Sequence, residues 1–169
     1  CVMAADYAVR KGIPLASISE KAKADLSKIL PSFAALDNPI DITGALLSNS
    51  ALFGSVLPVV GNDAQSELLL VGLPVAGTGY DVARFAGDLK RFQDGFPHAV
   101  AVAAPQKSVR DEFTRAGIAT FAREREAMDA LAQLADHSKL LAGPAPAAAP
   151  RFPPPGRTRR RGYQPTIVG

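Results

Sequence analysis

Hydrophobic positions recur along the chain in two ways, as short unbroken runs and as stripes with a spacing of three or four residues. The unbroken run at residues 68–71 is too short for a helix and lacks polar alternation, which is typical of a parallel strand covered on both faces. Residues 99–103 predict a second buried strand, and residues 118–121 predict a third short one. Residues 13–18 predict a further strand, and Pro14 places it at a sheet edge because proline cannot donate to a ladder.

The stripes predict amphipathic helices between these runs. The expected helices lie at residues 1–11, 19–30, 50–60 and 78–89, and around the apolar positions 109–116 and 127–135. Strand and helix alternate throughout, which predicts an α/β fold with a parallel sheet, right-handed crossovers and helices on both faces. We expect one domain over residues 1–141 and a disordered tail over residues 142–169, where prolines and alanines dominate.

The amino-acid composition argues against disulfide-rich, metal-binding and membrane proteins. In 169 residues there is one cysteine, Cys1, and the only histidines are His98 and His137, so we expect no disulfide framework and no metal site. No apolar run approaches the roughly 18 residues of a membrane span, and no cleavable signal is recognisable at the start. We therefore expect a cytoplasmic protein without membrane contact.

The positive net charge of +3 comes from the tail. Residues 142–169 contain five arginines and no acid, which leaves 14 basic and 16 acidic residues in the remainder. That remainder has no basic stripe with interleaved aromatic residues of the kind that follows a phosphate backbone. Nucleic-acid binding by the folded part is therefore not expected. The arginines at 157–161 keep open the alternative of a nucleic-acid binder that acts through its tail.

The turn after residues 68–71 contains the candidate binding chemistry. Gly77 and Gly79 can take positive φ and allow close approach to the backbone, while Thr78 offers a hydroxyl cap. A helix that begins near Thr78 would direct partial positive charge towards the carboxyl end of the preceding strand. We expect a phosphate or carboxylate to bind at Ala76, Gly77, Thr78 and Gly79. The alternative is that the glycines only shape a tight turn.

A second segment contains the motif Asn-Pro-x-Asp-x-Thr-Gly, formed by Asn38, Pro39, Asp41, Thr43 and Gly44. Leu30-Pro31 precedes it, and the strand–turn–helix pattern of residues 68–81 follows it. In this order the three features resemble the NDP-forming (ADP-forming) acyl-CoA synthetases, relatives of succinyl-CoA synthetase. The similarity covers residues 1–141 and points to that family's second flavodoxin-like ligase domain.

The resemblance implies a flavodoxin-like sheet of order 2-1-3-4-5 that lacks its first strand, which should lie directly before Cys1. The chain is then expected to be a fragment of a ligase that converts acyl-CoA, ADP and phosphate to acid, CoA and ATP through a phosphohistidine. In the family, two helix N-termini stabilise the phosphohistidine. By position, Ala76-Gly77-Thr78 matches a turn that contacts the phosphoryl or carboxylate group.

This sequence departs from the family in what it omits. It contains no phosphohistidine loop, no CoA-binding domain and no ATP-grasp domain, so we expect no catalytic residue and no cofactor in this chain. Coenzyme A, ADP or ATP and Mg belong to the full-length family, whose other domains or subunits are the expected partners. The oligomeric state stays open. The competing interpretation is a non-enzymatic α/β module for protein contacts.

Overall fold

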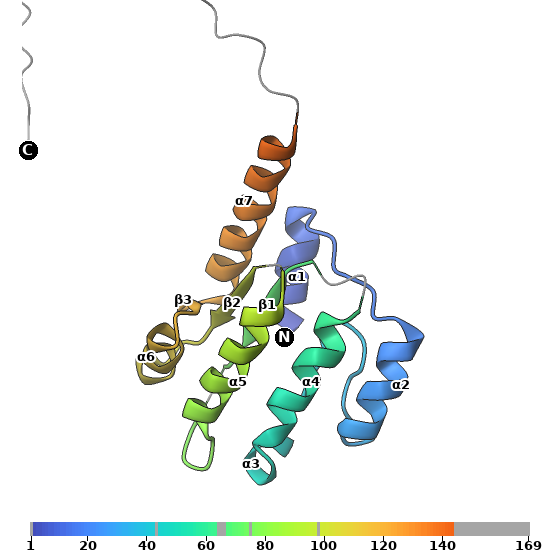
Figure 1. Ribbon diagram of the computed structural model, residues 1–169, viewed down its shortest axis with the longest axis vertical. Helices are drawn as coiled ribbons and strands as arrows, with labels where there is room; N and C mark the ends of the chain where they lie inside the picture. Colours follow the sequence, from blue (N-terminus) through green and yellow to red (C-terminus); the bar gives the residue numbers. More distant parts are fainter. Residues whose placement is uncertain (1, 43, 64–66, 75, 98, 144–169) are drawn as a thin grey trace, which may run out of the picture.

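The computed structural model describes residues 2–42, 44–63, 67–74, 76–97 and 99–143. Within these ranges a three-stranded parallel sheet is surrounded by helices (Figure 1). The strands lie in the order β1 (Leu69–Gly72), β2 (Val100–Ala103) and β3 (Ala119–Phe121). The helices of the described part are α1 (Val2–Lys11), α2 (Glu20–Ile29), α3 (Ala45–Ser48), α4 (Ala51–Gly61), α5 (Val82–Gly95), α6 (Lys107–Arg115) and α7 (Glu124–Ala142).

The two faces of the sheet are covered by different helices, because successive strand residues point to opposite sides. On one face Val102 packs in a cluster with the fully buried rings of Phe85 in α5 and Phe113 in α6. On the other face Ala101 packs with Leu131 of α7. The prediction of an α/β fold with a parallel sheet and helices on both faces is confirmed.

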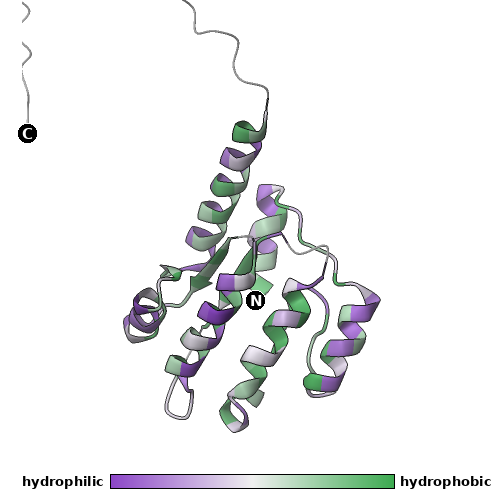
Figure 2. Ribbon diagram, viewed as in Figure 1, coloured by the Kyte–Doolittle hydropathy of each residue, from purple (hydrophilic) through white to green (hydrophobic). Residues whose placement is uncertain are grey.

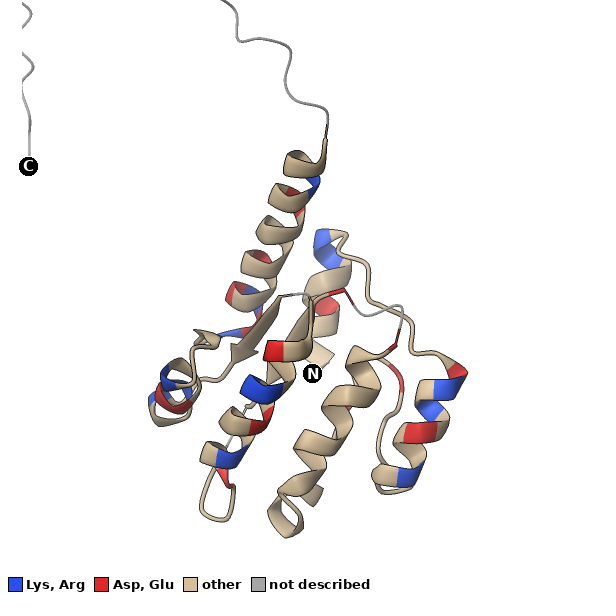
Figure 3. Cartoon of the chain, in the orientation of Figure 1, with Lys and Arg blue, Asp and Glu red and all other residues tan. Residues whose placement is uncertain are grey.

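Helix α4 lies beside α5 and extends the core away from the sheet. It contains no charged residue, as Figures 2 and 3 show. Phe53 of α4 lies 5.2 Å from Phe85 of α5, measured between ring centroids. Val56, also on α4, packs with Leu26 of α2 in a second apolar cluster. Since α4 has apolar partners on two sides, it connects α2 to the core that lies on the sheet.

Two glycines of α4 allow this close approach to α5. A Cβ atom on Gly61 would lie 2.4 Å from Cε2 of Phe92, and one on Gly54 would lie 2.7 Å from Oδ2 of Asp88. The ring of Phe92 is in turn stacked on Phe96, with 4.8 Å between the centroids. Any larger side chain at Gly61 therefore has to displace two packed rings.

The predicted strand at residues 13–18 is wrong. The segment is extended but has no ladder partner among the described residues. Its polar groups bond elsewhere, since the Ile13 N–H donates to Ala8 O at 2.9 Å and the Asn38 Nδ2–H donates to Ala16 O at 3.0 Å. Pro14 removes one further backbone donor. The segment contains the apolar residues Ile13, Leu15 and Ile18, but a strand also needs a neighbour with which to pair.

The edge of β1 that faces away from β2 is open in the described part of the chain. The N–H groups of Leu69 and Leu73 donate to β2 and its flanks, at 3.0 Å to Ala99 O and 2.8 Å to Ala103 O. By alternation the N–H groups of Leu70 and Gly72 point away from β2. All four residues of β1 are half-buried, whereas all four of β2 are buried.

This geometry predicts unequal hydrogen exchange along β1. The amides of Leu70 and Gly72 should exchange at least about tenfold faster than those of Leu69 and Val71, because only the latter pair is protected by β2. Residue-resolved exchange measured by NMR on the purified chain provides the test. Equal protection of all four amides would show that another strand occupies the open edge.

The glycine contact of α4 predicts a loss of stability on substitution. Gly61→Ala should lower the free energy of unfolding by about 1–3 kcal/mol, because the added methyl group overpacks the Phe92 ring. Gly95→Ala is the matched control, since a Cβ at Gly95 of α5 meets nothing within 4 Å. Urea denaturation of both variants gives the comparison. Indistinguishable midpoints would mean that the ring has room to move.

Candidate functional site

The candidate site lies at the carboxyl edge of the sheet, where α/β folds usually bind ligands. Gly72 and Ala103 are paired at the ends of β1 and β2, so the turns that follow these strands begin side by side. The two turns are joined by one side chain. The Oε1 atom of Gln106 accepts a hydrogen bond from the Ala76 N–H at 2.7 Å.

The turn at residues 76–80 is tight and depends on one glycine. The Tyr80 N–H donates to Gly77 O at 3.2 Å, and Gly79 has φ +101°. A Cβ on Gly79 would lie 3.2 Å from Cδ2 of Leu47 in α3. Positive φ and this close neighbour both favour glycine at position 79. At Gly77 neither condition holds, since a Cβ there meets nothing within 4 Å.

Helix α5 begins at Val82, so the predicted start near Thr78 is wrong. Asp81 is the N-cap residue, and its Oδ1 accepts from the Arg84 N–H at 3.0 Å. Thr78 lies before the cap and does not serve α5, because the left-handed backbone at Gly79 interrupts the helical dihedral angles. The N-terminus of α5 therefore already has a carboxylate at the place where an anion was expected to gain from the helix dipole.

The backbone donors of the turn itself are available. The N–H groups of Gly77, Thr78 and Gly79 make no hydrogen bond within the described residues, and all three residues are exposed. Three consecutive unpaired donors can receive the oxygens of a phosphate or carboxylate. The carboxylate of Asp81 lies two positions further along the chain, and its charge opposes such an anion.

Helix α6 begins beside this turn with a cation that is already paired. The Lys107 Nζ donates to Oδ2 of Asp111 at 2.7 Å, and this hydrogen bond holds the pKa of Asp111 below its ordinary value. Gln106, the N-cap residue of α6, makes no side-chain bond to its own helix. Its amide is committed to Ala76 instead.

Residues 38–42 of the motif form a loop with hydrogen bonds to other segments. The peptide bond before Pro39 is cis, and the Asn38 amide bonds to the 13–18 segment as described above. The Asp41 N–H donates to Ala35 O at 3.2 Å in an isolated antiparallel bridge. Thr43 lies outside the described residues. Gly44 is the N-cap residue of α3.

The structure brings the end of the motif loop close to the turn. Ile42 and Ala76 pack against the same core cluster. Leu47 lies in α3, which follows the motif directly, and it is the side chain that contacts Gly79. Two segments that are separated by about thirty residues in sequence are therefore neighbours at one edge of the sheet.

Sequence reasoning missed Asp81 and Gln106. For Asp81 a signal existed, because an aspartate directly before an apolar stripe is a typical helix start. Gln106 offers no local pattern, since its partner is 30 residues away. Only the fold shows that the two turns meet.

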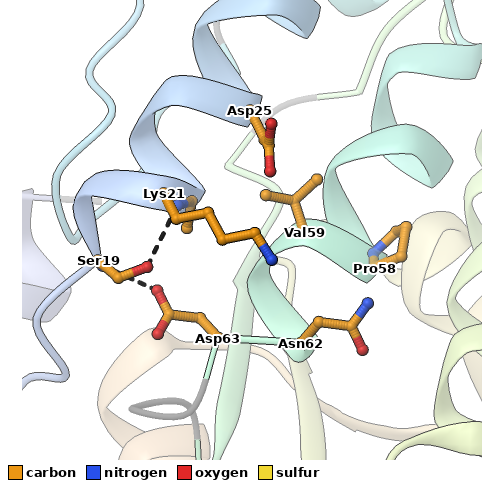
Figure 4. Close-up of a pocket in the computed structure, with 8 residues that line it drawn as sticks. Ser19, Lys21, Asp25, Pro58, Val59, Asn62 and Asp63 are labelled. Carbon is orange, nitrogen blue, oxygen red and sulfur yellow. Dashed lines mark hydrogen bonds between the residues drawn. The ribbon is translucent and has the colours of Figure 1, made fainter.

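A polar hollow of about 200 Å³ lies between the start of α2 and the end of α4 (Figure 4). The buried carboxylate of Asp63 accepts from the Ser19 N–H there at 2.8 Å, and Ser19 Oγ accepts from the Ala22 N–H at 3.2 Å. Ser19 is thus the N-cap of α2, as its sequence position predicts. The hollow contains none of the predicted site residues, and its hydrogen bonds join α4 to α2.

Other chemistry is not found in the described residues. They contain no group of three or more His, Cys, Asp or Glu side chains that could hold a metal ion. No helix in the same ranges is both long and apolar enough to cross a bilayer.

Comparison with solved structures identifies the fold. The crystal structure of PH0766 from Pyrococcus horikoshii OT3 matches with a TM-score of 0.71 and 21% identity, over 82% of this chain and 33% of that one. The apo form of the dinucleotide forming acetyl-coenzyme A synthetase 1 of Ca. Korarchaeum cryptofilum matches with a TM-score of 0.71 and 20% identity. This match covers 83% of this chain and 31% of that one. The complex of that enzyme with phosphate and ADP matches equally well.

No family model matches the sequence, and no curated protein matches it. At 20–21% identity the structural likeness shows a shared fold. The chain spans about a third of the length of these neighbours. An acetyl-coenzyme A synthetase is thus among the structural neighbours, in agreement with the resemblance that the Asn-Pro-x-Asp-x-Thr-Gly motif indicates.

Proposed function

We propose that this chain acts as a domain of an NDP-forming acid–CoA ligase, an enzyme that converts acyl-CoA, ADP and phosphate to acid, CoA and ATP. The observation that carries the proposal is the placement of the motif loop at residues 38–44. Leu47 of α3, the helix that directly follows this loop, lies against Gly79 of the exposed turn at 76–79. The fold is shared with an acetyl-coenzyme A synthetase. Neither the motif nor the turn alone would support the assignment.

Within this function the turn binds the phosphoryl group of a phosphohistidine, or the substrate carboxylate. Gly77, Thr78 and Gly79 supply three N–H groups that make no hydrogen bond to any described residue, and Gly79 permits the backbone to present them. Hydrogen bonds to an anion are roughly twice as strong as neutral ones, so a backbone site of this size needs no cationic side chain. The chain would contribute binding, while the reacting groups come from elsewhere.

The remaining parts of the reaction belong to other domains or subunits. The matched part of this chain covers only about a third of each of the two proteins that share its fold. Coenzyme A, ADP or ATP and Mg would be held by the parts of such a ligase that have no counterpart here. The described residues place no histidine at the turn, so the phosphorylated side chain would also arrive from a partner.

Phosphate titration tests the binding role. Amide shifts of Gly77, Thr78 and Gly79 should respond first, and Asp81→Asn should tighten phosphate binding by about two- to fivefold, because asparagine caps as well as aspartate but carries no charge. Asp94→Asn is the control, since it makes the same change of charge at the other end of α5. An equal gain in both variants, or shifts confined to the arginines at 157–161, would contradict a site at the turn.

The domain role also predicts that this chain alone is inactive. Incubated with acetyl-CoA, ADP and phosphate, it should form no ATP above a boiled control, because it contains neither a phosphohistidine loop nor a nucleotide domain. A luciferase assay for ATP measures this directly. ATP formation that scales with the concentration of the chain would refute the proposed division of labour.

A further inference from the structure

We infer that Gln106 is a positioning residue for the anion-binding turn at residues 76–79, an inference that rests on the proposed function. Its amide oxygen accepts from the Ala76 N–H at 2.7 Å in a part-buried position. The Leu73 N–H bonds to Ala103 before the turn, and the Tyr80 N–H bonds to Gly77 within it. Among the described residues, the Ala76–Gln106 hydrogen bond is the one that joins the turn itself to another element.

The backbone directly before Gln106, at Ala104 and Pro105, is fixed by hydrogen bonds. The Ala104 N–H donates to Phe121 O at 2.9 Å, which fixes the segment to the end of β3. From the other side, Nη1 of Arg110 donates to the carbonyl oxygens of Ala104 and Pro105 at 2.6 and 2.7 Å. Ala104, two residues before Gln106, is therefore held by both a strand and a helix, and Pro105 is held by the helix. Because this backbone is fixed, the amide oxygen of Gln106 is held in a narrow range of positions.

The direction of the side chain is unusual for its place in the fold. Gln106 is the N-cap residue of α6, a position at which short polar side chains normally bond to their own helix. Its longer side chain reaches instead to the neighbouring turn. The N-terminus of α6 therefore has no side-chain cap from Gln106. Instead, the Gln106 side chain anchors the exposed turn that follows β1 through its hydrogen bond to Ala76.

The anchor determines which donors face outwards. Ala76 is half-buried and its N–H is directed inwards at Gln106, whereas the following three residues are exposed with unpaired N–H groups. Because the anchor orders the turn before a ligand arrives, the anion does not have to offset the cost of ordering it. Gln106 acts on the anion through Ala76 and does not touch the anion itself.

The opposite role is also testable. If the Gln106 amide merely occupied a donor that the anion needs, its removal would strengthen anion binding. The two roles therefore predict changes of opposite sign for a variant that lacks the acceptor.

The experiment compares Gln106→Met, which keeps the length but not the acceptor, with Gln106→Glu, which keeps the acceptor and adds a charge. Gln133→Met on the exposed face of α7 is the control. We expect Gln106→Met to weaken phosphate binding at least threefold and to speed Ala76 amide exchange at least tenfold, with an unchanged melting temperature. Gln106→Glu should keep the Ala76 amide protected.

A pH series separates positioning from a general structural effect. With sulfate as the probe, Gln106→Glu should bind more weakly than the unmodified chain at pH 7, and the ratio of the two affinities should approach one as the pH falls to about 3, where the glutamate is mostly neutral. Equal or tighter phosphate binding by Gln106→Met overturns the inference alone. Absence of shifts at residues 77–79 in the unmodified chain overturns the proposed function instead.

Discussion

The packing of α4 on α5 is the constraint on which the rest of the arrangement depends. Gly54 and Gly61 bring the backbone of α4 close to Asp88 and Phe92, and the other sides of α4 meet α2 and the motif loop. Among the described elements α2 packs on α4, so its position is set through α4. A change in the distance between α4 and α5 would therefore also move α3 and the Leu47 side chain that supports the turn.

At the carboxyl edge of the sheet, charged side chains and backbone N–H groups differ in whether they are available to a ligand. Side-chain charges there are satisfied locally, with Asp81 on the start of α5 and Lys107 on Asp111. What stays available is the backbone of the exposed turn. Under the proposed function, such a site would bind its anion weakly, which suits a surface that receives a group attached to another domain and later releases it.

The sequence predicted the strands and helices well where the apolar pattern sets the secondary structure. It predicted them poorly where the secondary structure depends on a distant segment with which to pair. The segments at 68–71, 99–103 and 118–121 contain the three strands, and pairing in the sheet removes much of their apolar surface from water. The segment at 13–18 has a similar pattern but no neighbouring strand, so it stays extended and bonds to Asn38. The tether from Gln106 to Ala76 could not be foreseen, since it depends on the register of β1 and β2.

No strand of the described residues pairs with the outer side of β1, which has a consequence for how this chain behaves in concentrated solution. Natural sheets protect such edges with lysines, prolines or bulges, and Leu69–Gly72 contains none of these. Self-association through this side would be driven by main-chain dipoles and leucine side chains, so the formal charge of +3 would not prevent it. Ionic strength would then have little influence on the colloidal stability of the chain, whereas a single lysine introduced on that side would have a large one.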